Sequence, residues 1–135
     1  MDSRSNPVDV LKIKPIESIV LRNPGGRIWT ALPDILAIDA RFDISQIIIF
    51  QHSDCGTSYL DESLIVKKFG ESVKPDDSEN VKIRDDVIKY KVHNGEQSVR
   101  DDLALLKKQT YLRKELIDTA VGLYMDTHTG LIKRV

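Results

Sequence analysis

Two residue types that bind transition metals stand close together near the middle of the chain. His52 and Cys55 are separated by two residues, and Gly56 follows them. Imidazole and thiolate are ligands that suit zinc, and a glycine lets the backbone turn sharply. Such a pair is only half of a tetrahedral zinc site. The alternative is a buried cysteine that behaves as a small hydrophobic residue beside a hydrogen-bonded histidine.

A short strand precedes this pair. Four consecutive apolar residues, Ile47 to Phe50, are too few and too β-branched for a helix, so we predict a strand over 46–50. An uninterrupted apolar run is typical of a strand buried on both faces in a parallel sheet. Ligands and metals are held beyond the strand ends of open α/β sheets. We therefore expect His52 and Cys55 just past the end of this strand.

The rest of the pattern alternates between strands and helices. Apolar spacing predicts a helical turn over 7–11, strands over 16–21, 118–125 and 131–135, and helices over 30–42, 58–69 and 98–112. The stretch 71–80 is rich in acidic and turn residues and predicts a surface loop, whereas 81–91 fits either a helix or an extended segment. These elements predict an α/β fold, a mostly parallel sheet flanked by helices.

Composition limits the possible functions. The 135 residues are 41% hydrophobic and 30% charged, which predicts one domain over 1–135. The net charge of −1 and the lack of a basic cluster argue against nucleic-acid binding, and no apolar run could cross a membrane. The single cysteine and the lack of a leader sequence favour the cytoplasm, although a targeting segment upstream of Met1 stays open.

Three ordered motifs carry a family resemblance. Asp2-Ser3-Arg4, Arg22-Asn23-Pro24-Gly25-Gly26 and His52-Ser53-Asp54-Cys55-Gly56 resemble motifs of the β-class carbonic anhydrases, with Pro24 in place of the usual alanine. The end of the chain, from Gly122 to Leu131, is similar to the closing hairpin of that family. The resemblance therefore extends over nearly the whole chain.

The resemblance implies a zinc enzyme. His52 and Cys55 would bind Zn²⁺, and Asp2 and Arg4 would form a catalytic carboxylate–guanidinium pair beside the metal. A zinc-bound water has a pKa of about 7, so that metal-bound hydroxide could convert carbon dioxide reversibly to bicarbonate and a proton. Asp2 would orient the hydroxide, although in part of the family this aspartate binds the metal in an inactive form. The residues implied as the supporting turn near the site are Arg22, Asn23, Gly25, Gly26 and Gly56.

The chain also departs from the family pattern. The first zinc-ligand cysteine of the family directly precedes the position of Met1, and the N-terminal helix and first central strand are missing as well. That strand would lie between the strands predicted over 16–21 and 46–50, so its loss leaves unpaired backbone facing a gap. Either the sequence begins at an internal methionine, which we favour, or Asp2 or the Met1 amino group completes a two-ligand site.

Two rival functions remain. Relatives of the family hydrolyse CS2 or COS with the same ligands, and a non-catalytic, metal-free interaction protein could keep the same fold. The resemblance also implies a homodimer or higher homo-oligomer.

His93 and His128 have no partner at ligand spacing, so we expect both outside the site. We expect Trp29 and Tyr59 to be packing residues.

Overall fold

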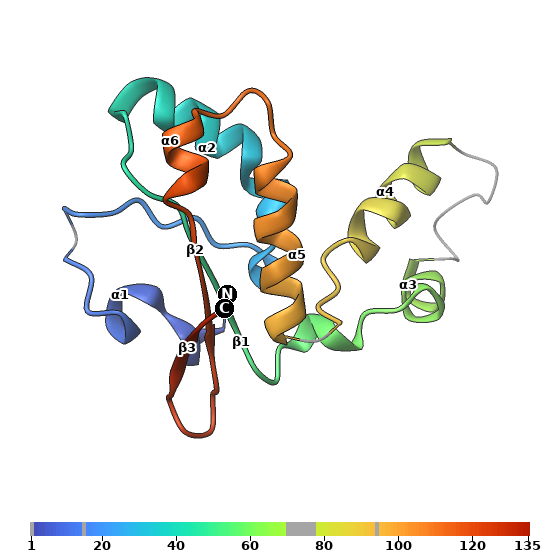
Figure 1. Ribbon diagram of the computed structural model, residues 1–135. Helices are drawn as coiled ribbons and strands as arrows, with labels where there is room; N and C mark the ends of the chain where they lie inside the picture. Colours follow the sequence, from blue (N-terminus) through green and yellow to red (C-terminus); the bar gives the residue numbers. More distant parts are fainter. Residues whose placement is uncertain (1, 15, 70–77, 94) are drawn as a thin grey trace.

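The computed structural model describes residues 2–14, 16–69, 78–93 and 95–135. Its elements in chain order are η1 (Ser3–Ser5), α1 (Pro7–Val10), η2 (Pro24–Gly26), α2 (Ile28–Phe42), β1 (Ile48–His52), η3 (Gly56–Tyr59), α3 (Glu62–Phe69), α4 (Ser78–Ile88), α5 (Gly95–Lys107), α6 (Lys114–Asp118), β2 (Val121–Met125) and β3 (Ile132–Arg134), where η marks a 3-10 helix. The predicted α/β fold, with helices around a sheet, is confirmed (Figure 1). No helix in these ranges is long and apolar enough to cross a membrane.

The three strands form one small sheet in the order β1-β2-β3. β1 and β2 run parallel, with Ile48 opposite Val121 and His52 opposite Met125, whereas β2 and β3 are antiparallel. The sheet therefore has one parallel and one antiparallel pairing, because β3 returns along β2 directly after a tight turn. These strands correspond to the predictions over 46–50, 118–125 and 131–135, with shifted ends.

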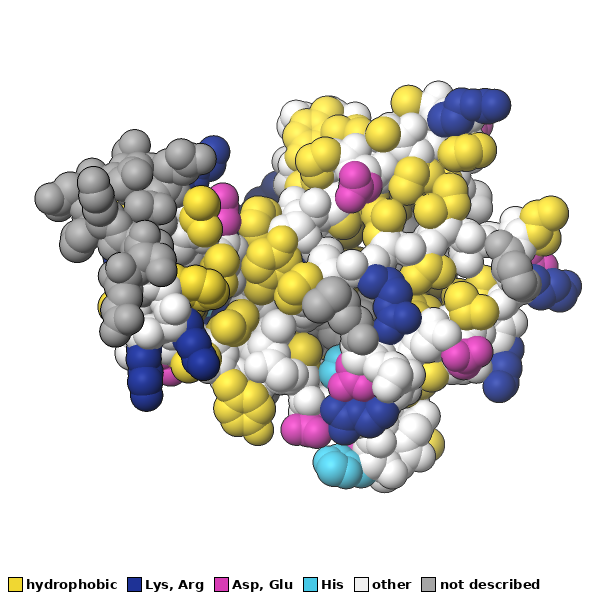
Figure 2. Space-filling model, turned by 180° about the vertical axis from the view of Figure 1, so that it is seen from behind, with side chains coloured by type: hydrophobic (Ala, Val, Ile, Leu, Met, Phe, Trp, Pro, Cys, Tyr) yellow, Lys and Arg dark blue, Asp and Glu magenta, His cyan; other side chains and the backbone are white. Residues whose placement is uncertain are grey.

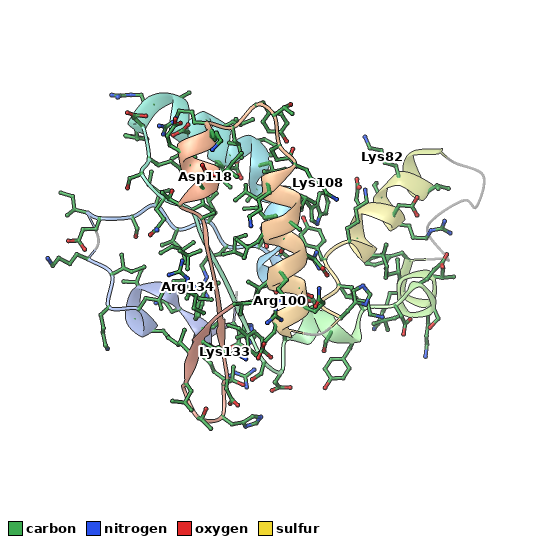
Figure 3. All side chains as sticks on the ribbon, viewed as in Figure 1. Lys82, Arg100, Lys108, Asp118, Lys133 and Arg134 are labelled. Carbon is green, nitrogen blue, oxygen red and sulfur yellow. The ribbon has the colours of Figure 1, made fainter. Side chains whose placement is uncertain are left out.

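Helix α5 packs against β1 and β2. A Cβ atom at Gly122 would lie 2.5 Å from Val99 Cγ1 and 2.8 Å from Leu103 Cδ1, so this close approach requires glycine. Lys133 of β3 donates to Glu96 at 3.1 Å, and Arg100 approaches the same carboxylate at 3.4 Å (Figure 3). The buried core lies among α2, α5, α6 and the sheet and contains Ile28, Ala31, Ile35, Ile47, Ile49, Val99, Leu106, Leu112 and Leu116.

Helix α2 begins earlier than the sequence predicts. The sequence predicts a start at residue 30, but the helix begins at Ile28, and the Thr30 hydroxyl accepts from the side chain of Asn23 at 2.8 Å. The amide of Ile28 donates to the carboxylate of Asp102 on α5 at 3.3 Å. A contact with a distant residue thus satisfies a free backbone amide at the start of the helix. The local sequence pattern cannot predict such a contact.

The predicted helix over 58–69 is two elements, η3 and α3. Asp61 separates them, since its carboxylate accepts from the Leu64 amide and the Ser63 hydroxyl, both at 2.7 Å, as an N-cap does. The helix predicted over 98–112 is α5, which begins at Gly95, so that Ser98 lies buried inside it.

The sequence left the structure of 81–91 open and predicted a loop over 71–80. The ambiguous stretch 81–91 is mostly helix α4, while most of the predicted loop over 71–80 lies outside the described residues. Helices α3 and α4 contact each other and extend away from the sheet as an arm (Figure 1).

The strand predicted over 16–21 is wrong. Residues 18–21 have no regular secondary structure, and none of their backbone groups is hydrogen-bonded to another described residue. A strand needs a neighbour to satisfy its backbone groups, and none of the described residues pairs with residues 18–21. The expectation that β1 is buried on both faces is also wrong. Ile49 and Gln51 are 3% and 2% exposed, but Ile48, on the other face, is 44% exposed.

Candidate functional site

A pocket of about 240 Å³ joins the three motifs that the sequence analysis singled out. It lies beyond the end of β1 and is lined by Asp2, by the turn from Arg22 to Gly26, and by His52, Cys55 and Gly56. The structure therefore brings together residues from the start of the chain, from the turn before α2 and from the loop after β1. Of the predicted site residues, only Arg4 does not line this pocket, and Arg4 binds Asp2, which does.

His52 is the last residue of β1. Its Nδ1 atom lies 2.7 Å from the carbonyl oxygen of Ser53, so Nδ1 is the protonated nitrogen of the neutral ring and Nε2 carries the free lone pair. This backbone contact fixes the orientation of the imidazole in the way that zinc-binding histidines are usually held. The neighbouring Cys55 thiol raises the pKa of His52.

Cys55 follows a left-handed residue. Asp54 has a φ of 53°, a conformation that aspartate tolerates better than most residues, so the sharp turn lies here and not at Gly56. The interaction with His52 lowers the pKa of Cys55 to about 7, and the Thr57 hydroxyl, 3.2 Å from Sγ, acts in the same direction. A substantial fraction of the sulfur is therefore thiolate near neutral pH, and thiolate is the form that binds metals.

Asp2 and Arg4 form a two-pronged ion pair. Arg4 Nη2 lies 2.6 Å from Asp2 Oδ2, Arg4 Nε lies 3.1 Å from both carboxylate oxygens, and the Arg4 amide donates to Oδ1 at 2.9 Å. These hydrogen bonds from Arg4 hold the pKa of Asp2 well below its usual range, so Asp2 is an acceptor at neutral pH. Arg4 also makes a second contact, which its position in the sequence does not predict: its Nη1 reaches Asp54 Oδ2 at 3.1 Å. Through Asp54 the ion pair is fastened to the His52–Cys55 loop.

The turn before α2 supports this pair. Arg22 Nη2 donates to the carbonyl oxygen of Asp2 at 3.0 Å, and Asn23 closes the turn through its hydrogen bond with the Arg27 amide at 2.8 Å. Gly25 and Gly26 have φ values of 68° and 61°. A Cβ atom on Gly26 would also lie 2.9 Å from the Phe50 carbonyl oxygen, so both conformation and space favour glycine there.

A buried ion pair behind the pocket is another feature that the sequence analysis missed. Asp102 of α5 is fully buried and accepts from Arg27 Nε at 3.1 Å and from Gln51 Nε2 at 2.9 Å. Burial raises the pKa of Asp102, while the Arg27 guanidinium opposes that rise. Gln51 directly precedes His52, so this network anchors the strand end that carries the metal-ligand candidates. No sequence signal distinguishes Asp102 from the exposed Asp101 beside it.

The residues present fit a zinc ion as two of its ligands. His52 Nε2 and the Cys55 thiolate are ligands that zinc prefers. No group of three or more His, Cys, Asp or Glu side chains suited to a metal occurs among the described residues. Of the two groups suggested as substitute ligands, Asp2 is bound by Arg4, and Met1 lies outside the described residues. His93 and His128 are exposed and do not line the pocket.

Comparisons with known proteins identify the fold. No protein-family model matches the sequence, and no curated protein matches it. Among solved structures, a carbonic anhydrase from Streptococcus mutans matches 100% of this chain and 76% of its own chain, with 24% identity and a TM-score of 0.81. A β-carbonic anhydrase of Trichomonas vaginalis matches 99% of this chain and 77% of its own, with 22% identity and a TM-score of 0.76.

A carbon disulfide hydrolase in its apo form is also similar. It matches 98% of this chain and 73% of its own, with 19% identity and a TM-score of 0.76. The chain has the fold of the β-carbonic anhydrases.

Proposed function

We propose that this chain is a zinc-dependent enzyme of the carbonic anhydrase type, which hydrates carbon dioxide reversibly to bicarbonate and a proton. The observation that carries the proposal is the pocket, because it places a histidine–thiolate pair beside an aspartate that an arginine holds ionised. Its volume of about 240 Å³ accepts a substrate of a few atoms.

His52 and Cys55 would hold the metal. The Ser53 carbonyl orients the imidazole so that Nε2 is available, and the shifted pKa of Cys55 supplies a thiolate near neutral pH. Zinc bound by such ligands lowers the pKa of a water molecule to about 7 and so makes a nucleophile available at neutral pH. The thiolate also offsets part of the charge of the cation.

Asp2 would orient the reacting water. Because Arg4 occupies both carboxylate oxygens from one side, Asp2 stays ionised and can only accept hydrogen bonds. An accepted hydrogen bond from water directs the water's remaining lone pair toward the substrate carbon. Arg22 holds the backbone of Asp2, and Asp54 holds Arg4, so the carboxylate is fixed from two sides.

A second candidate is hydrolysis of carbon disulfide or carbonyl sulfide. The likeness in fold to a carbon disulfide hydrolase favours it, and the same ligands would serve. The two reactions are separated by their products, since carbon dioxide hydration releases a proton without sulfide. Both assays should be run on one preparation, with a pH indicator for hydration and a sulfide-specific reagent for hydrolysis.

Zinc content is the first test. The 135-residue chain should be purified without chelator and analysed for zinc, and we expect about one zinc per chain. Cys55→Ser should lose most of the metal, whereas His128→Gln, which changes an exposed histidine outside the pocket, should retain it. Zinc near zero in the unmodified chain would contradict the proposal and favour a metal-free interaction protein of the same fold.

A separate variant tests the role of Asp2. Asp2→Asn keeps the shape of the side chain but removes the charge and weakens the ion pair with Arg4. We expect it to retain zinc and to lower the hydration rate at least about a hundredfold, the lower end of what a positioned proton acceptor contributes. An unchanged rate at full zinc content would refute the role of this carboxylate.

We also propose that the chain is cytoplasmic and self-associates into a homodimer or a higher assembly. Support for self-association comes from the arm, where Val66, Phe69 and Ile83 are half exposed, because apolar surface of this kind marks interaction sites. Light scattering tests it, and a monomer at micromolar concentration would contradict it.

A further inference from the structure

The turn between β2 and β3 lies against the loop that carries the candidate metal ligands. Both lie at the lower end of the molecule in Figure 1. In the view from behind, acidic, basic and histidine side chains gather at this end, whereas most hydrophobic side chains lie above it (Figure 2). The amide of Ser53, which directly follows β1, donates to the carbonyl oxygen of Met125 at 2.8 Å. Further hydrogen bonds join Ser53 to Thr127 in the turn.

Three polar contacts hold Ser53 and Thr127 together. The Thr127 amide donates to Ser53 Oγ at 2.9 Å, the two hydroxyl oxygens lie 2.9 Å apart, and Thr127 Oγ1 lies 3.5 Å from the Ser53 carbonyl oxygen. One arrangement of the hydroxyl protons satisfies all three contacts. In it, Ser53 Oγ donates to Thr127 Oγ1, and the Thr127 hydroxyl donates to the Ser53 carbonyl oxygen. Thr127 therefore holds both the side chain and the carbonyl group of Ser53.

The Ser53 carbonyl oxygen is also the acceptor that orients His52. It lies 2.7 Å from His52 Nδ1, and a carbonyl oxygen can only accept, so this contact keeps the proton on Nδ1 and leaves Nε2 for a metal. The left-handed φ of 53° at Asp54 takes the chain out of the β1–β2 ladder directly after this carbonyl group. The direction of the carbonyl group therefore depends on contacts from outside the ladder.

The turn that carries Thr127 is closed by its own hydrogen bonds. Asp126 Oδ1 accepts from the amides of His128 and Thr129 at 2.8 and 3.0 Å. The Asp126 carbonyl oxygen accepts from the amide of Gly130 at 2.8 Å, and the φ of 74° at Gly130 suits glycine. The turn thus presents the Thr127 hydroxyl group in one defined position.

A chain of contacts runs from this turn to the imidazole. We propose that Thr127 is a positioning residue for His52, which sets the orientation of the imidazole through Ser53 and so keeps Nε2 available to the metal. The inference rests on the proposed function, because it treats His52 as a zinc ligand. Thr127 lies outside the three motifs and does not line the pocket.

NMR of the metal-free chain tests this role. The ¹⁵N chemical shift of His52 Nδ1 shows whether this nitrogen carries the proton, and we expect it to be protonated in the unmodified chain. Thr127→Val keeps the shape of the side chain but removes the hydroxyl group. The Nδ1 shift should then move toward the value of an unprotonated nitrogen, because the ring samples both tautomers. Thr127→Ser retains a hydroxyl group and should restore the unmodified shift.

Thr129→Val is the matched control. It removes a hydroxyl group from the same turn, but Thr129 is exposed and its hydroxyl group accepts from the Leu131 amide at 3.3 Å. This variant should leave the Nδ1 shift of His52 unchanged.

Zinc affinity, measured by competition with a chromogenic chelator, is the second readout. Hydrogen-bond partners behind a metal-binding histidine typically contribute about 10–100-fold to metal affinity, and Thr127 acts through Ser53, so we expect a loss of about tenfold in Thr127→Val. Thr127→Ser and Thr129→Val should bind zinc as the unmodified chain does.

Several outcomes would overturn the proposal. They are an unprotonated Nδ1 in the unmodified chain, an unchanged Nδ1 shift or zinc affinity in Thr127→Val, and an equal change of the Nδ1 shift in Thr129→Val, which would indicate a general loosening of the turn. An unmodified chain that binds no zinc would contradict the proposed function instead. The NMR comparison would still decide the role of Thr127, because it needs no metal.

Discussion

Replacing Asp102 with alanine tests whether the buried ion pair holds the candidate site together. The Asp102 carboxylate accepts hydrogen bonds from three places: the Arg27 guanidinium, the amide of Ile28 at the start of α2, and the side chain of Gln51 next to His52. Asp102→Ala removes this shared acceptor. The Ile28 amide loses its partner, while Arg27 keeps only the Lys91 carbonyl oxygen at 2.8 Å and Gln51 only the Gly26 carbonyl oxygen at 3.3 Å. The Arg27 side chain is only 13% exposed, so water cannot replace the carboxylate fully.

The expected loss of stability follows from these contacts. Breaking a buried ion pair by removing one partner costs about 3–5 kcal/mol, because the remaining charge stays buried. We therefore expect the free energy of unfolding to fall by about 4 kcal/mol, which lowers Tm by about 14 °C for a chain of this length. Asp102→Asn keeps the size of the side chain and one acceptor oxygen, so its loss should be about half as large.

Thermal and urea unfolding of the metal-free chain, followed by circular dichroism, measure the effect. The matched control is Asp101→Ala, since Asp101 is the preceding residue of the same helix but is exposed. That variant should change the free energy of unfolding by less than about 0.5 kcal/mol. If Asp102→Ala were as mild as Asp101→Ala, the reasoning that this network anchors the end of β1 would be refuted.

Three further predictions concern the site itself. In metal-free protein, alkylation of Cys55 by iodoacetamide should have a midpoint near pH 7, and His52→Ala should move the midpoint upward, because His52 is the main cause of the lowered pKa. Since the pKa of Cys55 is lowered from its ordinary 9.0, the stability that its thiolate contributes is present above pH 9 and is lost as the pH falls through about 7, which unfolding curves at several pH values should show. Gly26→Ala should cost about 1–3 kcal/mol in unfolding experiments, because of its φ of 61° and its contact with Phe50, whereas Gly56→Ala, with nothing within 4 Å of the added Cβ, should be neutral.

The grouping of the candidate site could be predicted because its three motifs resemble those of one family, while strand and turn signals predicted the elements that carry two of them. The apolar run before His52 indicated a strand, and the glycine pair after Asn23 indicated a turn. The structure places both beside Asp2, as the motifs suggested. The roles of these residues stay predictions until zinc and activity are measured.

Other parts of the site could not be predicted, since they depend on contacts between distant residues. Asp54 is one example: it supplies the left-handed turn and also binds Arg4, yet in the sequence no local signal marks this aspartate between His52 and Cys55. Asp102 is another. An acidic residue near the start of a predicted helix is usually exposed and favours the helix dipole, but α5 begins at Gly95 and Asp102 is fully buried in the core.

The segment 16–21 shows most clearly that a local sequence pattern alone does not determine whether a strand forms. Its β-branched residues have the composition of a strand, but residues 18–21 form no ladder, because no described backbone pairs with them. Strand propensity describes how well side chains fit a paired, half-buried surface, so the same residues remain irregular when the neighbour is missing. The 96% exposure of Ile16, the 53% exposure of Ile19 and the failed strand prediction thus have one common cause.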